Sequence, residues 1–163
     1  MSEAGFFCRV EKRSIIFLNK YSVDILRISL GIIFILFGAV KFWNGLSPAE
    51  GLAIRTLNVL TFNCIKGIIA IKILAAWECL IGAGLLYNKY IRVTLILLFI
   101  HLLGTFLPLL FFPKEIWTSP PLVFTILGQY IVKNLVLISA AMVLAASRKT
   151  VVIKKTEYGE TRI

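Results

Sequence analysis

The stretch VDILRISLGIIFILFGAVKFW, residues 23–43, decides the fold class. A helix crosses the roughly 30 Å hydrocarbon layer of a bilayer in about 20 residues, and this stretch is largely apolar over that length. It is too long and too continuous for the core of a signal peptide, so we expect it to be retained as a first membrane span. Trp43 at its end suits the aromatic belt at a membrane interface.

Three further apolar runs of similar length cover residues 67–87, 91–112 and 122–146. Together with the first span they predict an all-α integral membrane four-helix bundle. The short turn between the second and third runs makes those two helices antiparallel neighbours. Pro108 is expected to kink the third span near its outer end.

The composition agrees with a protein that lies in a bilayer. Of the 163 residues, 59% are hydrophobic and 16% are charged, whereas soluble domains have about 45–50% and about 25%. The net charge of +10 lies mainly in the tails and one short turn, and the aromatic residues lie mostly within the apolar runs. Because the two are not interleaved as in a nucleic-acid platform, the expected partner is the lipid bilayer and no nucleic acid.

The distribution of Lys and Arg predicts the orientation of the bundle. The two tails and the middle turn hold eleven of these residues, and the two other connections hold three. The positive-inside rule therefore places both termini in the cytoplasm, an N-in/C-in topology. We divide the chain into a cytoplasmic N-terminal tail or interfacial helix, a membrane domain and a basic cytoplasmic C-terminal tail, which cover residues 1–20, 21–146 and 147–163.

The first outer connection, residues 44–66, is too polar to span a membrane and too apolar to be a flexible linker. Ser47, Pro48 and Glu50 fit the N-cap, first and third positions of a helix. We therefore expect a short amphipathic helix on the outer face. Three of its leucines are expected to face lipid or the bundle: Leu52, Leu57 and Leu60.

One face of the first span carries small and basic residues. Five residues recur at steps of four and three and so share that face: Arg27, Gly31, Phe34, Gly38 and Lys41. The glycines allow another helix to approach closely. The two basic groups lie about 21 Å apart along the axis, one near each membrane boundary. They either join the bundle or extend to the lipid headgroups.

Glu78 lies near the middle of the second span, where a carboxylate is costly. It must be protonated or meet a cation. Gly82 lies four residues further on and marks the same face as a packed side. The carboxyl group either ties helices together or acts in ligand binding or proton relay.

His101 and three residues of the fourth span complete a predicted polar cluster. Gln129 and Lys133 are four residues apart, and Asn134 lies beside them. We predict that Lys133, also near mid-depth, pairs with Glu78. His101 and Gln129 are expected next to this pair, where the imidazole forms structural hydrogen bonds, handles protons or bonds a quinone-like carbonyl. This lone histidine predicts no metal site.

The three cysteines, Cys8, Cys64 and Cys79, form no CxxC pair, so we expect no disulfide framework. Cys64, on the predicted outer face, is either a reactive thiol or an ordinary unpaired one. The sequence lacks a Walker loop and a Ser-His-Asp set, which argues against a self-contained enzyme of those types. Whether the chain catalyses a reaction stays open.

Three stretches carry a family resemblance: RISLGIIFILFGAVKFW at 27–43, WECLIGAGLLY at 77–87 and GQYIVKNLVLISAAMVL at 128–144. They resemble the DoxX superfamily of small bacterial four-helix membrane proteins, and residues 101–138 are similar to its YkgB/RclC-like branch. The resemblance covers roughly residues 21–146. The matching positions are Arg27, Gly31, Gly38, Lys41, Glu78, Gly82, Lys133 and Asn134.

The resemblance implies a place in the bacterial inner (plasma) membrane and a quinone-connected role in a redox or oxidant/sulfur-stress system. One branch of the family contains the membrane subunit of a thiosulfate:quinone oxidoreductase. Quinone is thus the candidate cofactor, and electron transfer would require it or a redox partner subunit. The alternatives are a non-catalytic membrane assembly or stress-response component, and a small transporter or channel. The last would need a homo-oligomer, which Gly31 and Gly38 would permit.

Overall fold

The computed structural model describes residues 3–43, 45–119 and 123–160, and the side chains of residues 11–43, 45–119 and 123–147. This part of the chain is mostly helical and contains four helices that are long and apolar enough, by length and composition, to cross a membrane. The elements in chain order are α1 (Glu3–Val40), α2 (Glu50–Leu60), α3 (Gly67–Tyr87), α4 (Ile91–Gly104), α5 (Pro108–Phe111), α6 (Pro113–Ile116), β1 (Trp117–Ser119), β2 (Val123–Phe124) and α7 (Ile126–Glu160).

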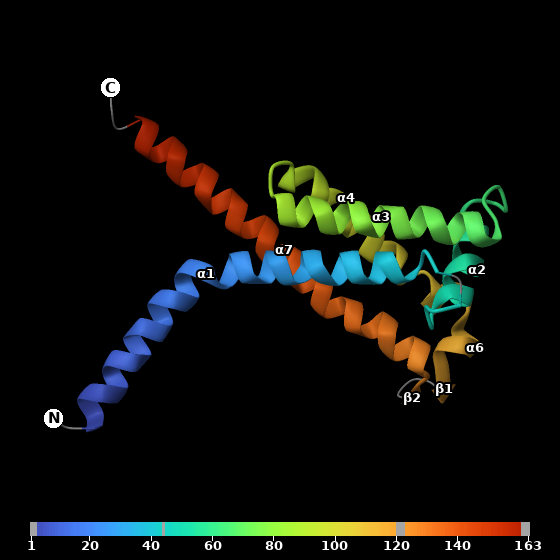
Figure 1. Ribbon diagram of the computed structural model, residues 1–163, viewed down its shortest axis with the longest axis horizontal. Helices are drawn as coiled ribbons and strands as arrows, with labels where there is room; N and C mark the ends of the chain where they lie inside the picture. The colour runs from blue at the N-terminus through green and yellow to red at the C-terminus, as the bar shows by residue number, and fades with distance from the viewer. Residues whose placement is uncertain (1–2, 44, 120–122, 161–163) are drawn as a thin grey trace.

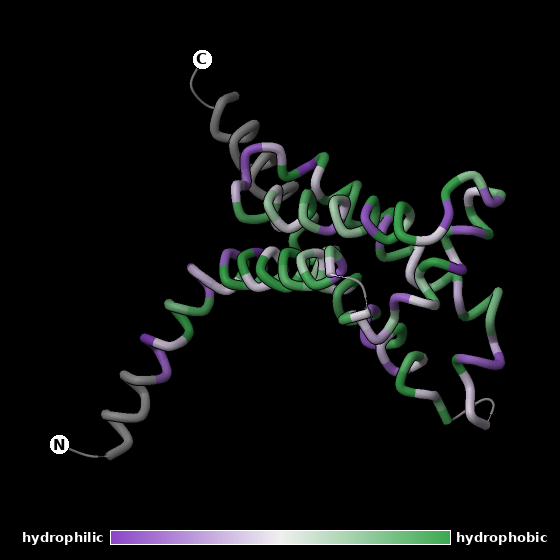
Figure 2. The backbone as a smooth tube through the Cα atoms, turned by 45° about the vertical axis from the view of Figure 1, so that its right-hand side comes forward, coloured by the Kyte–Doolittle hydropathy of each residue, from purple (hydrophilic) through white to green (hydrophobic). Residues whose placement is uncertain are grey.

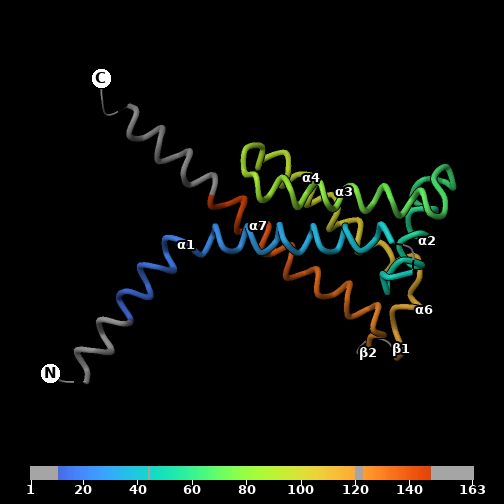
Figure 3. The backbone as a smooth tube through the Cα atoms, in the orientation of Figure 1, coloured from blue at the N-terminus to red at the C-terminus, as the bar shows by residue number. Residues whose placement is uncertain are grey.

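The long helices form a bundle whose two ends differ in structure. Both chain ends lie at one end, and α2, α6 and the β1–β2 hairpin gather at the other (Figures 1 and 3). In the hairpin, Trp117 pairs with Phe124, and their stacked rings have centroids 4.1 Å apart. Helix α1 bends where it leaves the bundle, and its first part diverges from the last part of α7 (Figure 1).

The predicted spans agree with the structure best where a turn ends them. The second predicted span coincides with α3, Gly67–Tyr87. The terminal helices run further than the predicted spans, because α1 begins at Glu3 and α7 continues to Glu160. The third candidate span, Ile91–Phe111, is interrupted just before Pro108, near the predicted kink: α4 ends at Gly104, a turn follows, and α5 begins with Pro108. Proline is tolerated at that first helical position because it lacks a backbone N–H.

The connection between the first two spans contains helix α2, but the predicted Ser47 N-cap is wrong. Ala49 occupies the N-cap position, and no side-chain hydrogen bond caps the helix. The residues before it form a turn, in which the Glu50 N–H donates to the Ser47 carbonyl oxygen over 3.1 Å. The Glu50 carboxylate instead accepts a hydrogen bond of 2.7 Å from the Gly45 N–H. Helix α2 therefore begins later than the sequence pattern predicts.

Helices α1 and α3 approach each other most closely, because glycines stand where the two backbones meet. A Cβ on Gly82 would lie 2.7 Å from the Gly31 carbonyl oxygen, and one on Gly38 would lie 2.8 Å from the Ala75 carbonyl oxygen. The glycine face of α1 is thus turned toward α3 of the same chain. Gly31 and Gly38 therefore give no support to a homo-oligomer.

The buried core lies between α1, α3, α4 and α7 and centres on Ile81, Leu85 and Leu98, which have no exposed surface. Many other large apolar side chains point outward. Figure 2 shows apolar residues along most of the bundle helices. Water would penalise so much exposed apolar surface, so this arrangement favours a lipid bilayer as the surroundings.

Candidate functional site

Lys41 and Glu78 form an ion pair between the end of α1 and the middle of α3. Lys41 Nζ lies 2.6 Å from Glu78 Oε2, and the two side chains are 12% and 7% exposed. Lys41 directly follows the last residue of α1, and its Nζ also donates to the Phe37 carbonyl oxygen over 3.3 Å. A buried carboxylate needs a cation or a proton, and Lys41 supplies the cation.

His101 approaches the same carboxylate from α4. Its Nε2 lies 3.3 Å from Glu78 Oε1, and its side chain is 8% exposed. The Phe34 ring meets the imidazole edge-on, with ring centroids 5.5 Å apart. The structure thus brings His101 to Glu78, and three helices contribute to one group of polar side chains. We call it the Lys41–Glu78–His101 cluster.

The predicted Glu78–Lys133 pair is wrong. Lys133 is exposed, and its Nζ lies 5.4 Å from the centroid of the Tyr130 ring. Gln129 is exposed as well. Lys133 and Gln129 stand two residues on either side of the buried Ile131, about 200° around the helix, so they point away from the bundle. Depth in the membrane did not determine which way these side chains point.

Asn134 points toward α4 and meets Thr105, a residue that the sequence patterns did not single out. Asn134 Nδ2 donates to Thr105 Oγ1 over 2.9 Å, and the Thr105 hydroxyl donates to the Leu102 carbonyl oxygen over 2.6 Å. Thr105 lies four residues after His101, so the two belong to one side of that segment. This i, i+4 spacing is the signal by which Thr105 could have been found.

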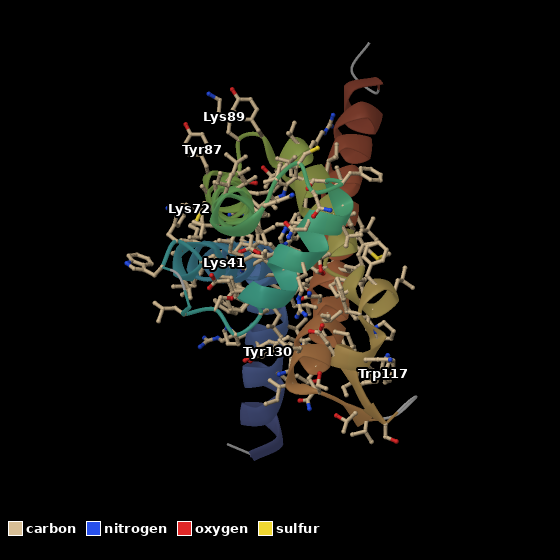
Figure 4. All side chains as sticks on the ribbon, turned by 90° about the vertical axis from the view of Figure 1, so that its right-hand side faces the viewer. Lys41, Lys72, Tyr87, Lys89, Trp117 and Tyr130 are labelled. Atoms are coloured by element: carbon tan, nitrogen blue, oxygen red, sulfur yellow. The ribbon has the colours of Figure 1, made fainter. Side chains whose placement is uncertain are left out.

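A cavity of about 650 Å³ opens beside these polar groups. Helix α2 forms an apolar wall through Leu52, Leu57 and Leu60. Figure 4 looks onto the α2 end and shows Lys41 close to α2, nearer the middle of the bundle than Lys72 or Lys89. Ligand pockets measure about 300–1,000 Å³ and combine an apolar lining with a few polar groups. Here the polar groups include Lys41, Glu78, His101, Thr105 and Asn134.

The α2 wall is joined to the base of α7 through α6. Arg55 donates to both oxygens of the Glu115 carboxylate over 2.6 and 2.5 Å. The Arg55 guanidinium also lies 5.5 Å from the centroid of the Phe112 ring. The Thr125 hydroxyl donates to the Glu115 carbonyl oxygen over 2.7 Å, and Ile116 is fully buried. Two parallel hydrogen bonds of this kind fix both the orientation and the distance of α2 relative to α6.

Arg27 lies at the other end of the glycine face of α1. Its guanidinium donates to the carbonyl oxygens of Leu85 and Leu86, over 2.5 and 3.3 Å, and lies 3.3 Å from Asp24. Those carbonyls belong to the last turn of α3, where carbonyls lack partners within the helix. The negative end of the helix dipole also favours a cation there. Arg27 therefore caps α3 and does not line the cavity.

No family model, curated protein or solved structure matches the chain. The chemistry of the site itself is therefore the basis for assigning a function. Within the described residues, no three His, Cys, Asp or Glu side chains gather as metal ligands. Cys64 is a free, exposed cysteine, and Cys79 is free and half-buried; the reactivity of Cys64 stays a prediction.

Proposed function

We propose that this protein is a DoxX-like, multi-pass component of the bacterial inner membrane that binds a quinone for a redox or oxidant/sulfur-stress system. The observation that carries the proposal is the Lys41–Glu78–His101 cluster on the wall of a largely apolar cavity. The apolar lining suits the ring and tail of a quinone, and the polar cluster suits its carbonyl oxygens. The resemblance stated for the sequence supports the same ligand.

The cluster has the groups needed to bind a carbonyl and to move a proton. Lys41 Nζ has three N–H bonds, of which two are directed at Glu78 and at the Phe37 carbonyl, so one is left for a ligand. The imidazole of His101 faces Glu78 through Nε2 and has a second nitrogen that can take or give a proton. In this proposal a partner redox subunit supplies the electrons.

The proposed topology has both termini in the cytoplasm and the cavity near the outer face. Its supports are the Lys and Arg distribution and the position of both chain ends at the end of the bundle opposite α2 (Figure 1). On this topology α2 is an amphipathic helix at the outer boundary. Trp43 and Phe62, which are 63% and 90% exposed, would anchor that boundary.

The first experiment is to extract and identify the bound quinone. The wild-type protein is purified in mild detergent beside Glu78→Gln and Lys133→Met, extracted with organic solvent and examined by mass spectrometry. We expect quinone in the wild type and in Lys133→Met, because Lys133 points away from the cavity. We expect its loss in Glu78→Gln, which releases Lys41 from its carboxylate partner.

Each variant is also incubated with a short-tailed quinone before extraction, and its folding is checked by size-exclusion chromatography. Wild-type protein that holds no quinone after both treatments would contradict the proposal. If the wild type and a well-folded Glu78→Gln retain equal amounts of quinone, the ligand does not bind at the Lys41–Glu78–His101 cluster, and the assigned site is wrong.

The second candidate function is a non-catalytic membrane assembly or stress-response component. The observation that favours it is the position of the Lys41–Glu78 pair, which joins α1 to α3 beside the close contact at Gly38. On this alternative the pair only stabilises the bundle. Glu78→Gln would then lower the unfolding temperature, and neither it nor the wild type would retain a quinone.

A further inference from the structure

We propose that Asn134, held by Thr105, is a second polar contact for the ligand and that, together with Lys41, it selects a neutral head carrying two carbonyl oxygens. The tail of the ligand lies along α2. This inference rests on the proposed function and deepens it. It names a tailed quinone as the class of ligand and excludes anionic lipids and fatty acids.

Two hydrogen-bond donors line the cavity from different elements. Lys41 follows α1 and has one N–H left after its bonds to Glu78 and to the Phe37 carbonyl. Asn134 belongs to α7 and uses one N–H of its amide on Thr105. Within the described residues this is the one side-chain hydrogen bond that Asn134 makes, so its second N–H is available. Two separate donors suit a head with two acceptors.

Residues of one segment connect to both donors. His101, which faces Glu78, and Thr105, which holds Asn134, lie one helical turn apart. On a helix that separation is about 5–6 Å between Cβ atoms. Both polar contacts therefore adjoin one segment of the chain and line the wall of the same cavity. A fatty acid has both oxygens on one carbon, so it offers a single polar end to two separate donors.

The charges of the site favour a neutral head. Lys41 carries one positive charge and Glu78 one negative charge at a distance of 2.6 Å, so the pair has no net charge. An anionic head would find its cation already paired, and it would bring the Glu78 carboxylate a second negative charge. A carbonyl oxygen meets neither penalty, because it needs only an N–H donor.

The α2 wall offers the tail an apolar surface. Leu52, Leu57 and Leu60 line the cavity along a helix of 11 residues, which is about 16 Å long. Leu52 is buried, whereas Leu60 is 43% exposed, so the wall leads from the interior toward the surface. A tail along this wall would keep its apolar carbons out of water.

The test measures which head groups bind near Trp77, which lines the cavity. The chain has three tryptophans, so Trp43→Phe and Trp117→Phe together leave Trp77 as the single indole. A decyl-tailed benzoquinone is titrated in detergent, and its quenching of Trp77 gives the affinity. Decylbenzene, which lacks carbonyls, and decanoate, which is anionic, are then added as competitors. We expect neither to displace the quinone at equal concentration.

The two variants are Asn134→Leu and Thr105→Val, and Lys133→Met is the matched control on the neighbouring exposed position. Removing the second contact is expected to weaken quinone affinity about fivefold in Asn134→Leu, because one hydrogen bond is lost. Thr105→Val is expected to have a smaller effect in the same direction, because the Asn134 amide loses its hydroxyl partner. Lys133→Met is expected to bind as the wild type does.

The outcomes separate this inference from the proposed function. Quinone binding that is lost in Glu78→Gln but unchanged in both Asn134→Leu and Thr105→Val would overturn the second contact and leave the proposed function standing. Displacement of the quinone by decanoate at equal concentration, seen as recovery of Trp77 fluorescence, would overturn the neutral-head rule. Wild-type protein that does not bind the decyl-tailed quinone would overturn both proposals.

Discussion

Each end of the α1–α3 contact has one basic side chain, and the two side chains bind different kinds of partner. Arg27 is buried against the last turn of α3 and donates to backbone carbonyls. Lys41 is half-buried against the middle of α3, pairs with the Glu78 carboxylate and lines a cavity. One basic side chain on this face therefore donates to the backbone carbonyls at the end of α3, whereas the other lies beside a cavity.

A structural charge differs from a candidate functional one in how completely the fold alone accounts for it. Carbonyls at a helix end need donors in any protein, so Arg27 has a sufficient reason in the fold alone. A mid-span carboxylate is costly, and an apolar residue would pack there more cheaply. Packing alone therefore does not account for a carboxylate at position 78. A ligand in the adjoining cavity would account for it.

The largest expected effect is that of Lys41→Met. The variant leaves the Glu78 carboxylate buried beside His101 without its ammonium partner, and breaking a buried pair costs about 3–5 kcal/mol. The free energy of unfolding is measured by denaturant titration in mixed micelles. We expect the double variant Lys41→Met, Glu78→Gln to recover most of that stability, because no charge is then left alone.

The double variant also shows whether the pair does more than hold the bundle together. We expect it to be stable and yet unable to retain quinone, since the ammonium donor and the carboxylate are both gone. If the double variant recovers stability and binds quinone as the wild type does, the Lys41–Glu78 pair is purely structural, like the contact of Arg27.

The next effect is that of Gly82→Ala, which acts on both ends at once. The added methyl group would meet the Gly31 carbonyl oxygen and the Ile35 backbone nitrogen, at 2.7 and 2.8 Å. Because the backbone cannot turn aside, we expect a loss of about 1–3 kcal/mol in the free energy of unfolding. The control is Gly51→Ala on α2, where an added Cβ meets nothing within 4 Å. It is expected to leave stability unchanged or to raise it by about 0.4–1 kcal/mol.

Arg27→Met is expected to have an effect on stability no larger than that of Gly82→Ala, and to separate stability from binding. It removes the donor to the Leu85 and Leu86 carbonyls and costs about 1–3 kcal/mol. The cost stays below that of Lys41→Met because no buried charge is left unpaired. Quinone retained per folded molecule, measured after size-exclusion chromatography, should equal that of the wild type. A specific loss of quinone from folded Arg27→Met would mean that the two ends are coupled.

The spans could be predicted because membrane helices need apolar runs of about 20 residues, and such runs are visible in the sequence. Helix α3 agrees with its predicted bounds at both ends. The start of α2 was misplaced because a Ser–Pro pair fits a turn as well as an N-cap. The kink predicted at Pro108 corresponds to the interruption between α4 and α5, but the turn that forms it was not predicted.

The partner of Glu78 could not be read from depth alone. Lys133 and Lys41 are both basic residues of apolar spans, and the direction of Lys133 depends on the rotation of α7, which packing decides. The glycine positions indicate the pairing better than membrane depth does. Gly38 and Gly82 mark the faces on which α1 and α3 meet, and Lys41 and Glu78 lie within a turn of them. Combining the two faces would have predicted the observed pair. The quinone itself stays a prediction.

The smallest stability effect, and the sharpest test of the Lys41 end, is expected from Arg55→Gln. The Arg55–Glu115 pair holds the α2 wall of the cavity, but its side chains are 50% and 33% exposed, so its loss should cost about 0.2–1 kcal/mol. If α2 covers a ligand, a loosened wall releases it sooner. We expect quinone to leave several-fold faster, as followed by recovery of Trp77 fluorescence after dilution. The matched control is Lys114→Gln, which removes the same charge from the exposed residue next to Glu115. If quinone leaves both variants at the same rate, α2 does not control ligand release and, like the contact of Arg27, has only a structural role.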